Sequence, residues 1–470
     1  MMLVTHRGPY RFSMQDDGSF GATRGAGGIV SALLPLVLGN GHAAGAPAVG
    51  VEGDDERQSW VAAAIDDGDR DAITAGAAKV PGLDLHLLAL DPALHRMHYD
   101  VVSNGILWFL HHGLFDLPRR PRFDEHFRTA WDGYVAVNAS FADAVVNGAR
   151  PAERVLVHDY QLALVPGMVR ERRPDLRVAH FTHTPFCGPN SIRVLPTDVA
   201  ETLCASMASV PCGFHTNRWS RAYEASAAEM LGPDAAIAPA FATPLGPDPA
   251  ALAELAASDA TARAATALDE IVGDRKLVLR SDRIDLSKNI VRGFLVYDRL
   301  LTLHPEWRER VVFVALLNRS RESLADYLAY EQEVEHTAAR VNDRHGTAQW
   351  QPIVVDTHDD YEQTIAGFAR YDVLLVNPVK DGLNLVAKEG PLLNRRHGVV
   401  VLSPEAGAYD ELHEAVVPIH PYDIEQGADA LHRALSMPDD ERAARATRLC
   451  DLASVHTPQT WLDELLIHAR

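Results

Sequence analysis

The sequence contains little cysteine, no long apolar run and no basic excess. Its 470 residues include four cysteines, and no two of them form a CxxC pair, which excludes a disulfide-stabilised scaffold and a cysteine-ligated metal site. No stretch approaches the roughly 18 uninterrupted apolar residues of a membrane helix. The opening "MMLVTHRGPYRF" has neither the basic start nor the apolar core of a signal peptide. We therefore expect a cytoplasmic protein that has no membrane partner.

The shortage of basic residues limits what the protein can bind. Its 44 lysines and arginines stand against 64 aspartates and glutamates, which gives a formal net charge of −20. Such a charge repels polyanions, so we expect no nucleic-acid partner. If the substrate carries phosphate, its site must be a local group of basic residues within an acidic surface.

The chain alternates apolar strand-like runs with longer amphipathic segments, and it is too long for one hydrophobic core. Predicted strands are "MMLVT", "RVLVHD", "RVAHFTH", "KLVLRSD", "RVVFVALL", "WQPIVVD", "YDVLLVN" and "GVVVLS". Predicted helices include 136–149, 161–173, 289–303, 322–343 and 361–370. This alternation predicts an α/β protein with two doubly wound, Rossmann-like domains that face each other across a cleft. The segment 240–252, rich in proline and small residues, is the expected linker.

In the second half, charged residues follow two predicted strands. "LRSDRIDLSKN" carries Arg283 and Lys288, whose guanidinium and ammonium groups suit a diphosphate; alternatively, both are surface cations. The stretch "VKDGLNLVAKEG" predicts a helix beginning near Leu383, capped by Asp381 and ready to meet a phosphate or sugar. Asp381 and Glu389 would then share one helix face. The alternative is that Asp381 only caps and Glu389 only faces solvent.

In the first half, polar residues end three predicted strands. His158 and Asp159 end "LVHD", His183 ends "HFTH", and Arg7 ends the first strand. A histidine in such a place can equally be a structural residue, but two neighbouring strands with this ending favour a ligand site at the carboxyl edge. "RGAGG", which contains Gly25, Gly27 and Gly28, then opens a helix, although it lacks the GxGxxG spacing of a dinucleotide site.

Several longer motifs carry a family resemblance. "HDYQL", "HFTHTPF", "RIDLSKNIVRGFLVYDRLL", "NRSRESLADYLAYEQEVE", "VNPVKDGLNLVAKEG" and "LSPEAGAYDEL" resemble, in order, those of the trehalose-6-phosphate synthases. These are retaining glycosyltransferases of the GT-B fold. The resemblance implies an acceptor domain at 1–241, a nucleotide-sugar donor domain at 242–455, and a helix at 456–470 that returns to the first domain.

The resemblance also implies roles for individual positions. Arg283 and Lys288 would hold the donor diphosphate, Asp381 the donor sugar and Glu389 the ribose. The full set of implied donor-binding residues is Gly28, His183, Arg283, Lys288, Asp381, Asn384, Leu385, Val386 and Glu389. The implied acceptor-binding residues are Arg7, Tyr99, Trp108, Asp159, Tyr160 and Arg321. Those closest to the chemistry would be Asp159, His183, Arg283, Lys288 and Asp381.

The implied reaction moves glucose, with retention, from UDP- or GDP-glucose to glucose-6-phosphate and yields trehalose-6-phosphate. In this family a phosphate oxygen of the leaving group is held to take the acceptor's proton, so no general base, metal or cofactor is expected. A homo-oligomer is expected as well.

The chain also departs from the family pattern. Gln161 follows H-D-Y where histidine is common, Asn289 follows the lysine where glycine is common, and Asn318 occupies the region where a proline is common. These departures leave two alternatives open. One is a pseudoglycosyltransferase that couples a nucleotide-activated cyclitol to an aminocyclitol phosphate, and the other is a non-catalytic regulatory subunit.

Overall fold

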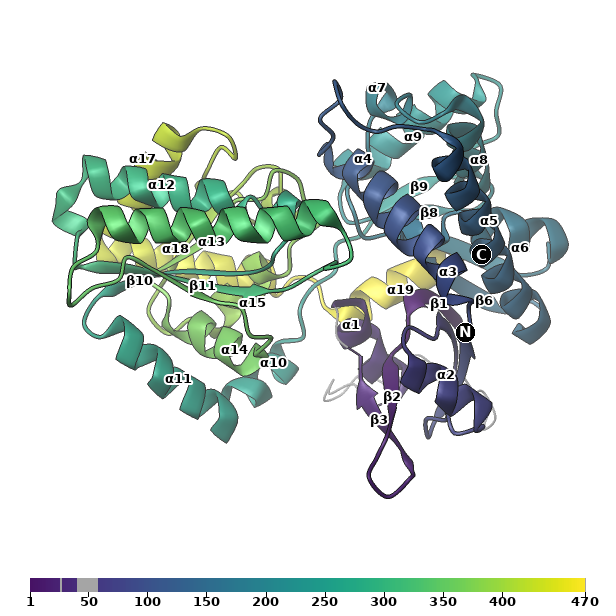
Figure 1. Cartoon of the computed structure of the whole chain (residues 1–470), viewed down its shortest axis with the longest axis horizontal. Coiled ribbons are helices and arrows are strands. Elements are labelled where there is room, and N and C mark those ends of the chain that lie inside the picture. Colours follow the sequence, from purple (N-terminus) through teal and green to yellow (C-terminus); the bar gives the residue numbers. More distant parts are fainter. Residues whose placement is uncertain (26–27, 40–57, 470) are drawn as a thin grey trace. The chain divides into compact units, whose positions relative to one another are not determined.

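The computed structural model describes residues 1–25, 28–39 and 58–469 of the chain, so Gly27 of the glycine string lies outside the described residues. The chain divides into two compact units, Met1–Pro244 with Pro458–Arg470, and Leu245–Thr457. Each unit contains one parallel sheet with helices packed against it (Figure 1). The sequence placed the divisions at 241/242 and 455/456.

The first unit contains a seven-stranded parallel sheet in the order β5-β4-β1-β6-β7-β8-β9. Its strands are β1 (Met2–Arg7), β4 (Gln58–Ala63), β5 (Leu83–Leu88), β6 (Arg154–His158), β7 (Arg177–Thr182), β8 (Cys212–Phe214) and β9 (Ala240–Ala242). The strand order reverses between β1 and β6, and this switch point is where doubly wound sheets bind ligands at their carboxyl ends. Arg7, at the end of β1, and Asp159, just after β6, therefore lie at the edge where a ligand is expected.

The helices of the first unit lie on both sides of this sheet. They are α1 (Gly28–Val37), α2 (Asp67–Thr74), α3 (Pro92–Arg96), a π-helical segment (Met97–Leu107), α4 (Trp108–His112), α5 (Glu125–Gly148), α6 (Val165–Arg172), α7 (Pro189–Ile192), α8 (Thr197–Ala208), α9 (Asn217–Leu231) and α19 (Pro458–His468). Helix α5 begins well before the predicted 136, because Asp124 accepts a hydrogen bond from the Phe127 backbone N–H at 3.1 Å and caps it there.

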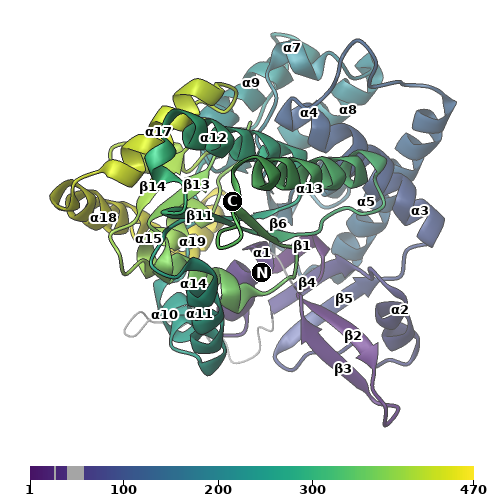
Figure 2. The same ribbon diagram turned by 60° about the vertical axis from the view of Figure 1, so that its left-hand side comes forward.

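A hairpin of β2 (Tyr10–Met14) and β3 (Phe20–Arg24) stands apart from the main sheet of the first unit (Figure 2). It is joined to the unit through Phe12, which is buried and whose backbone N–H donates to Asp69 Oδ1 of α2 at 2.9 Å. The sequence interpretation treated this stretch as a loop.

The second unit contains a six-stranded parallel sheet in the order β12-β11-β10-β13-β14-β15. The strands are β10 (Lys276–Arg283), β11 (Val311–Asn318), β12 (Ile353–Asp356), β13 (Val373–Val376), β14 (Val399–Leu402) and β15 (Val417–Pro418). Here the switch point lies between β10 and β13. The motifs with Arg283 and Asp381 follow these two strands, so the topology brings them to one edge.

Helices cover both faces of the second sheet. They are α10 (Pro249–Ala256), α11 (Asp259–Val272), α12 (Ile290–Leu303), α13 (Ala325–His345), α14 (Tyr361–Arg370), α15 (Val386–Leu393), α16 (Tyr409–Leu412), α17 (Ile424–Ser436) and α18 (Asp439–Ala453). Figure 1 shows α12 and α13 on one face and α11 and α14 on the other. Alternation along β10 explains the two layers, because Val278 packs into one apolar cluster while Leu277 and Leu279 pack into the other.

All eight predicted strands coincide with observed strands, but the sequence interpretation did not find β4, β5, β8, β9 and β15 of the two parallel sheets. "QSWVAA" contains too much alanine to indicate a strand, and only its pairing with β1 and β5 makes it one. The predicted linker also starts too early, because Ala240–Ala242 forms the edge strand β9. The connection to α10 comes after it.

Candidate active site

A group of paired charges lies at the switch point of the second unit. We call Arg280, Asp282, Lys288 and Asp381 the charge network. The ammonium of Lys288 donates to Asp381 Oδ2 at 2.6 Å and lies 3.6 Å from Asp282 Oδ1. Asp282 in turn accepts from Arg280 Nε at 3.0 Å. The two predicted residues Lys288 and Asp381 are therefore in direct contact, one from the turn after β10 and one from the turn after β13.

The environment of the charge network fixes its ionisation. Burial works against the charge of Lys288, yet the carboxylates of Asp381 and Asp282 outweigh it and raise its pKa. For Asp282, burial is the largest influence and raises its pKa, while Arg280 and Lys288 act in the opposite direction. Lys288 thus remains a cation throughout the physiological range.

Asp381 does not cap the following helix, so that prediction is wrong. Helix α15 begins at Val386, and the side chain of Asn384, one residue before the N-cap position Leu385, caps it by accepting from the Ala387 backbone N–H at 3.1 Å. Asn384 adopts a positive φ of 83° and donates from Nδ2 to Asp381 Oδ2 at 3.1 Å. Asp381 lies outside the helix, bridged to Ala406, and therefore shares no helix face with Glu389.

The start of α15 offers backbone donors beside Asp381. Leu385 is the N-cap residue and Val386 the first helical residue, and N–H groups at these positions have no partner within a helix. The Leu385 carbonyl already accepts from the backbone of Lys388 and Glu389, both at 2.8 Å. Asn384, Leu385 and Val386, whose backbone N–H groups are the predicted hydrogen-bond donors to phosphate and sugar, thus form one short turn.

Glu389 is partly buried, and its carboxylate makes no hydrogen bond or ion pair with the other described residues. Burial raises its pKa to about 7. An unpaired carboxylate of this kind is costly to bury unless a ligand satisfies it. The sequence alternative in which Glu389 only faces solvent therefore does not hold.

Two further arginines of the predicted site belong to the second unit. Arg283 is exposed at the end of β10. Arg321 is nearly buried, pairs through Nη1 with Asp285, and donates from the same nitrogen to Tyr327 Oη at 3.0 Å. Arg321 also has a positive φ of 52°, which marks its backbone as held by its surroundings.

In the first unit, Arg7 and Tyr99 are in contact. Arg7 Nη2 donates to Tyr99 Oη at 2.8 Å, and the guanidinium lies 5.9 Å from the tyrosine ring centroid. The Tyr99 ring stacks on His6 at 4.7 Å with an interplanar angle of 7°. Tyr99 belongs to the π-helical segment, a rare element that often marks functional sites. A cation and a phenol therefore meet at the end of β1.

The second aromatic pair consists of Trp108 and Tyr160, whose ring centroids are 5.9 Å apart. Trp108 stacks on His112 at 3.9 Å. Tyr160 Oη donates to Asn104 Oδ1 at 2.9 Å, and its backbone carbonyl accepts from Tyr134 Oη at 2.6 Å. Both predicted acceptor residues are thus nearly buried and held on two sides.

Asp159 and His183 are also brought together. Asp159 has φ 72° and ψ 165°, a conformation that a non-glycine residue adopts only under constraint. Its Oδ1 accepts from the His183 backbone N–H at 3.2 Å. The turn after β6 is therefore tied directly to the turn after β7.

His183 is the centre of a row of three imidazoles, which we call the histidine row: His158, His183 and His215. His183 Nε2 lies 3.2 Å from His158 Nδ1, and His183 Nδ1 lies 3.1 Å from His215 Nε2. Burial lowers the pKa of His158 to about 3 and of His183 well below its ordinary value. Both ring nitrogens of His183 are engaged, so a donor sugar can bond to it only by displacing a neighbouring histidine.

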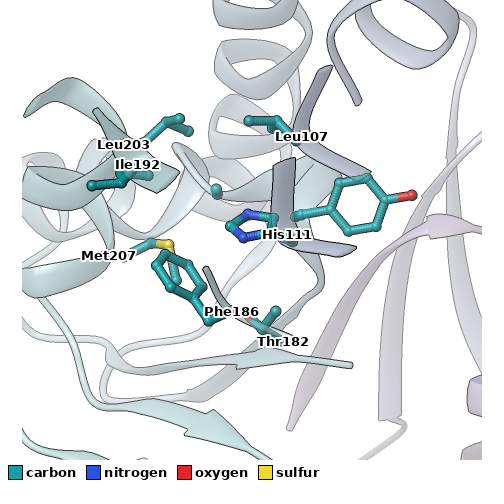
Figure 3. Close-up of a pocket in the computed structure, with 9 residues that line it drawn as sticks. Leu107, His111, Thr182, Phe186, Ile192, Leu203 and Met207 are labelled. Carbon is teal, nitrogen blue, oxygen red and sulfur yellow. The ribbon is translucent and has the colours of Figure 1, made fainter. Parts of the chain in front are cut away.

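Two other features do not belong to this site. A small cavity, lined by Tyr160, His111, Phe186 and Met207 among others, is mainly apolar, so it does not suit a sugar (Figure 3). His304, Glu306 and His432 could approach one metal ion, but the two imidazoles stack at 3.6 Å and 10°, which points their lone pairs in parallel.

Gly28, one of the predicted donor-binding residues, is the first residue of α1 and is exposed.

The chain matches one family profile, glycosyltransferase family 20, over residues 2–469. It belongs to that family. This family membership agrees with the resemblance read from the motifs. Within the described part of the chain, each helix is too short or too polar to cross a bilayer.

Named relatives and solved structures are similar to this chain over nearly its whole length. α,α-Trehalose-phosphate synthase [UDP-forming] A of Dictyostelium discoideum is 28% identical over 98% of this chain, which spans 61% of that relative's length. An E. coli trehalose-6-phosphate structure bound with UDP-2-fluoro glucose is 25% identical, with a TM-score of 0.83 and coverage of 100% and 99%. A UDP-forming α,α-trehalose-phosphate synthase from Burkholderia xenovorans, in complex with glucose-6-phosphate, is 25% identical, with a TM-score of 0.81 and coverage of 100% and 99%. The α/β, GT-B fold class is thereby confirmed.

Sequence reasoning missed Arg280, which contacts the residues of the charge network, and His215, which completes the histidine row. Arg280 interrupts the apolar run of β10. A charged residue at a core-facing strand position is unusual, and it could have indicated a functional role from the sequence. His215 follows the short strand β8, which the interpretation did not detect.

Proposed function

We propose that this protein is a retaining glycosyltransferase that moves glucose from a nucleoside-diphosphate glucose to glucose-6-phosphate and forms α,α-trehalose-6-phosphate. The second unit would bind the donor and the first unit the acceptor. The observation that carries the proposal is the contact between Lys288 and Asp381 at a sheet switch point, in a family 20 chain.

This ion pair suits a nucleotide sugar because each partner has a complementary group on that ligand. Lys288 can donate to the diphosphate, while Asp381 can accept from neutral sugar hydroxyls. Donor binding would exchange one ion pair for two charge-assisted contacts. Arg283 adds an exposed cation at the same edge, and the unpaired carboxylate of Glu389 suits the hydroxyl groups of a ribose.

The acceptor half rests on Arg7, Tyr99, Trp108 and Tyr160. Arg7 would bind the 6-phosphate and Tyr99 would steady its guanidinium. Arg321 is the second proposed phosphate ligand, and to act as one it must share or leave its partner Asp285. Asp159 would accept from acceptor hydroxyls beside Tyr160.

The chemistry requires no protein nucleophile. The bond between the anomeric carbon and the diphosphate breaks, and a bond to the anomeric oxygen of glucose-6-phosphate forms on the same face. The proton of that oxygen passes to the departing phosphate. Lys288, Arg283 and the start of α15 would stabilise the charge that develops on the leaving group.

The test is to offer the purified protein UDP- or GDP-glucose together with glucose-6-phosphate, glucose or an aminocyclitol phosphate, and to identify the products by mass spectrometry. We expect trehalose-6-phosphate and a nucleoside diphosphate. Turnover only with an aminocyclitol phosphate and a nucleotide-activated cyclitol would instead assign the chain to the pseudoglycosyltransferases. Nucleotide binding without turnover on any acceptor would indicate a regulatory subunit.

A further inference from the structure

We infer that Arg280 is a positioning residue for the donor site: it neutralises Asp282, so that the ammonium of Lys288 stays available to Asp381 and to a bound diphosphate. The inference rests on the proposed function and deepens its donor half. Nothing in the motif pattern assigns Arg280 a role.

Arg280 is a fully buried cation on the core-facing side of β10. Strand alternation places it beside Val278 and Asp282, on the face that α12 covers. An arginine at such a position is costly unless every charged group around it is paired, and apolar residues often serve a core better. Its presence in an otherwise apolar run therefore calls for a reason other than packing.

Each nitrogen of the Arg280 guanidinium has a partner in the turns that carry the donor site. Nε donates to Asp282 Oδ2 at 3.0 Å, Nη1 donates to Asn377 Oδ1 at 2.7 Å, and Nη2 donates to the Lys288 backbone carbonyl. Asn377 follows β13 and leads into the turn that carries Asp381. The planar guanidinium thus links the turns after β10 and β13, and this holds the Lys288 backbone, and with it the base of its side chain, in place.

The facing helix is built to admit this guanidinium. A Cβ on Gly293 of α12 would lie 2.5 Å from Arg280 Nη1 and 3.4 Å from Asn377 Oδ1. Gly293 is helical and buried, where glycine is otherwise unfavourable. The absent side chain on α12 is a second, independent sign that the space is kept for Arg280.

The charges of the network explain what the arginine does. Lys288 faces two carboxylates, Asp381 at 2.6 Å and Asp282 at 3.6 Å. With Arg280 bonded to Asp282, the four charges form two pairs and Lys288 balances Asp381 alone. Without Arg280, a buried Asp282 carboxylate would compete for the ammonium and draw it away from the diphosphate.

The experiment compares Arg280→Met, Asp282→Asn and the double variant R280M/D282N with wild type. We measure kcat and KM for UDP- or GDP-glucose and for glucose-6-phosphate, and the binding of UDP and GDP by calorimetry. R280M should lose about 100-fold in kcat/KM for the donor, with weaker nucleotide binding and an unchanged acceptor KM. The double variant should recover to within about tenfold of wild type, because no uncompensated carboxylate remains.

The controls separate positioning from simple misfolding. Arg299→Met removes a partly exposed arginine of α12 that pairs with Glu425 at 2.8 Å, and it should leave all constants unchanged. If R280M does not fold, Arg280→Lys answers the same question: it keeps the charge but loses the planar fork, and it should retain more donor affinity than Gly293→Ala, which displaces the guanidinium.

Two outcomes would overturn the inference. An R280M enzyme with donor constants within threefold of wild type would do so, and so would a double variant no better than R280M. In both cases wild-type turnover would leave the proposed function standing. A wild-type protein that binds neither nucleotide would instead remove the proposed function itself.

Discussion

The two sheets end in different kinds of polar chemistry. At the switch point of the second unit, the charge network holds two cations and two carboxylates within 3.6 Å of a partner. In the first unit, two members of the histidine row are uncharged, because burial lowers the pKa of His158 to about 3 and that of His183 well below its ordinary range. The charge network can exchange one of its ions for a charged ligand, whereas the rings of the histidine row share protons in N···N contacts.

This contrast suggests a division of labour. An ion pair can open for an anionic ligand because the ligand replaces one of its members. A row of neutral imidazoles instead fixes orientation, since each N···N contact needs one proton and sets which nitrogen donates. The charge network would therefore respond to the charge of the donor diphosphate, and the histidine row would fix the position of a neutral group.

The largest effect should come from breaking the charge network at Lys288. In the proposed reaction Lys288→Ala removes a cation that would stabilise the departing diphosphate and takes from Asp381 its ion-pair partner, so we expect turnover to fall by about 10²–10³-fold. Nucleotide release with glucose-6-phosphate as acceptor measures it. The exposed Lys79, replaced by Ala, is the control. Turnover within a few-fold of wild type would contradict the diphosphate assignment.

A smaller effect should come from Arg7, the cation that contacts Tyr99. Arg7→Ala removes a charge-assisted bond worth roughly 1.5–3 kcal/mol, so the KM for glucose-6-phosphate should rise about 10- to 100-fold. The activity with free glucose should barely change, since glucose carries no phosphate. Arg11→Ala, which removes an exposed pair with Asp66, is the matched control. Equal losses with both acceptors would contradict phosphate binding at Arg7.

The histidine row can be broken at His215, the member that contacts His183 Nδ1. His215→Phe removes the ring nitrogen that lies 3.1 Å from His183 Nδ1, so His183 should lose its fixed orientation and kcat should fall about tenfold. His215→Gln keeps a polar group there and should lose less. His126→Phe, at an exposed position of α5, should have no effect. Identical losses in the Phe and Gln variants would argue that size rather than hydrogen bonding matters.

The smallest effect on activity concerns Glu389, whose protonation also makes stability depend on pH. Burial raises its pKa to about 7 from an ordinary 4.5, so the folded state holds a proton that the unfolded chain releases. Wild type should therefore lose stability as pH rises from about 4.5 to about 7, by at most about 3 kcal/mol, whereas Glu389→Gln should not.

The same ionisation should affect the donor in the opposite direction. Ribose hydroxyls bond better to the ionised carboxylate, so the donor KM of wild type should fall a few-fold between pH 6 and pH 8. Glu389→Gln should flatten that profile, while the exposed Glu254→Gln should leave it intact. A flat wild-type profile would separate Glu389 from the donor.

Much of this arrangement could be predicted from the sequence because it follows local patterns. Strand runs followed by polar turns identified Arg7, Asp159, Lys288 and Asp381 at their sheet edges. Contacts that depend on tertiary pairing could not be predicted. Asn384 caps α15 in place of the predicted Asp381, because Asp381 forms a β-bridge with Ala406 before the helix begins. No local sequence rule predicts that bridge. Arg280 stayed unrecognised because its meaning depends on Gly293, which lies on another element.

Helix α19 has a consequence for the order in which the protein is made. Its Trp461 is fully buried, with its ring centroid 5.6 Å from that of His183 and 6.0 Å from that of His158. This wall of the histidine row follows the whole second unit in the chain. During synthesis, the first unit therefore lacks α19 until Leu245–Thr457 has left the ribosome. A translation product that stops before Pro458 would lack Trp461 and leave this side of the histidine row uncovered.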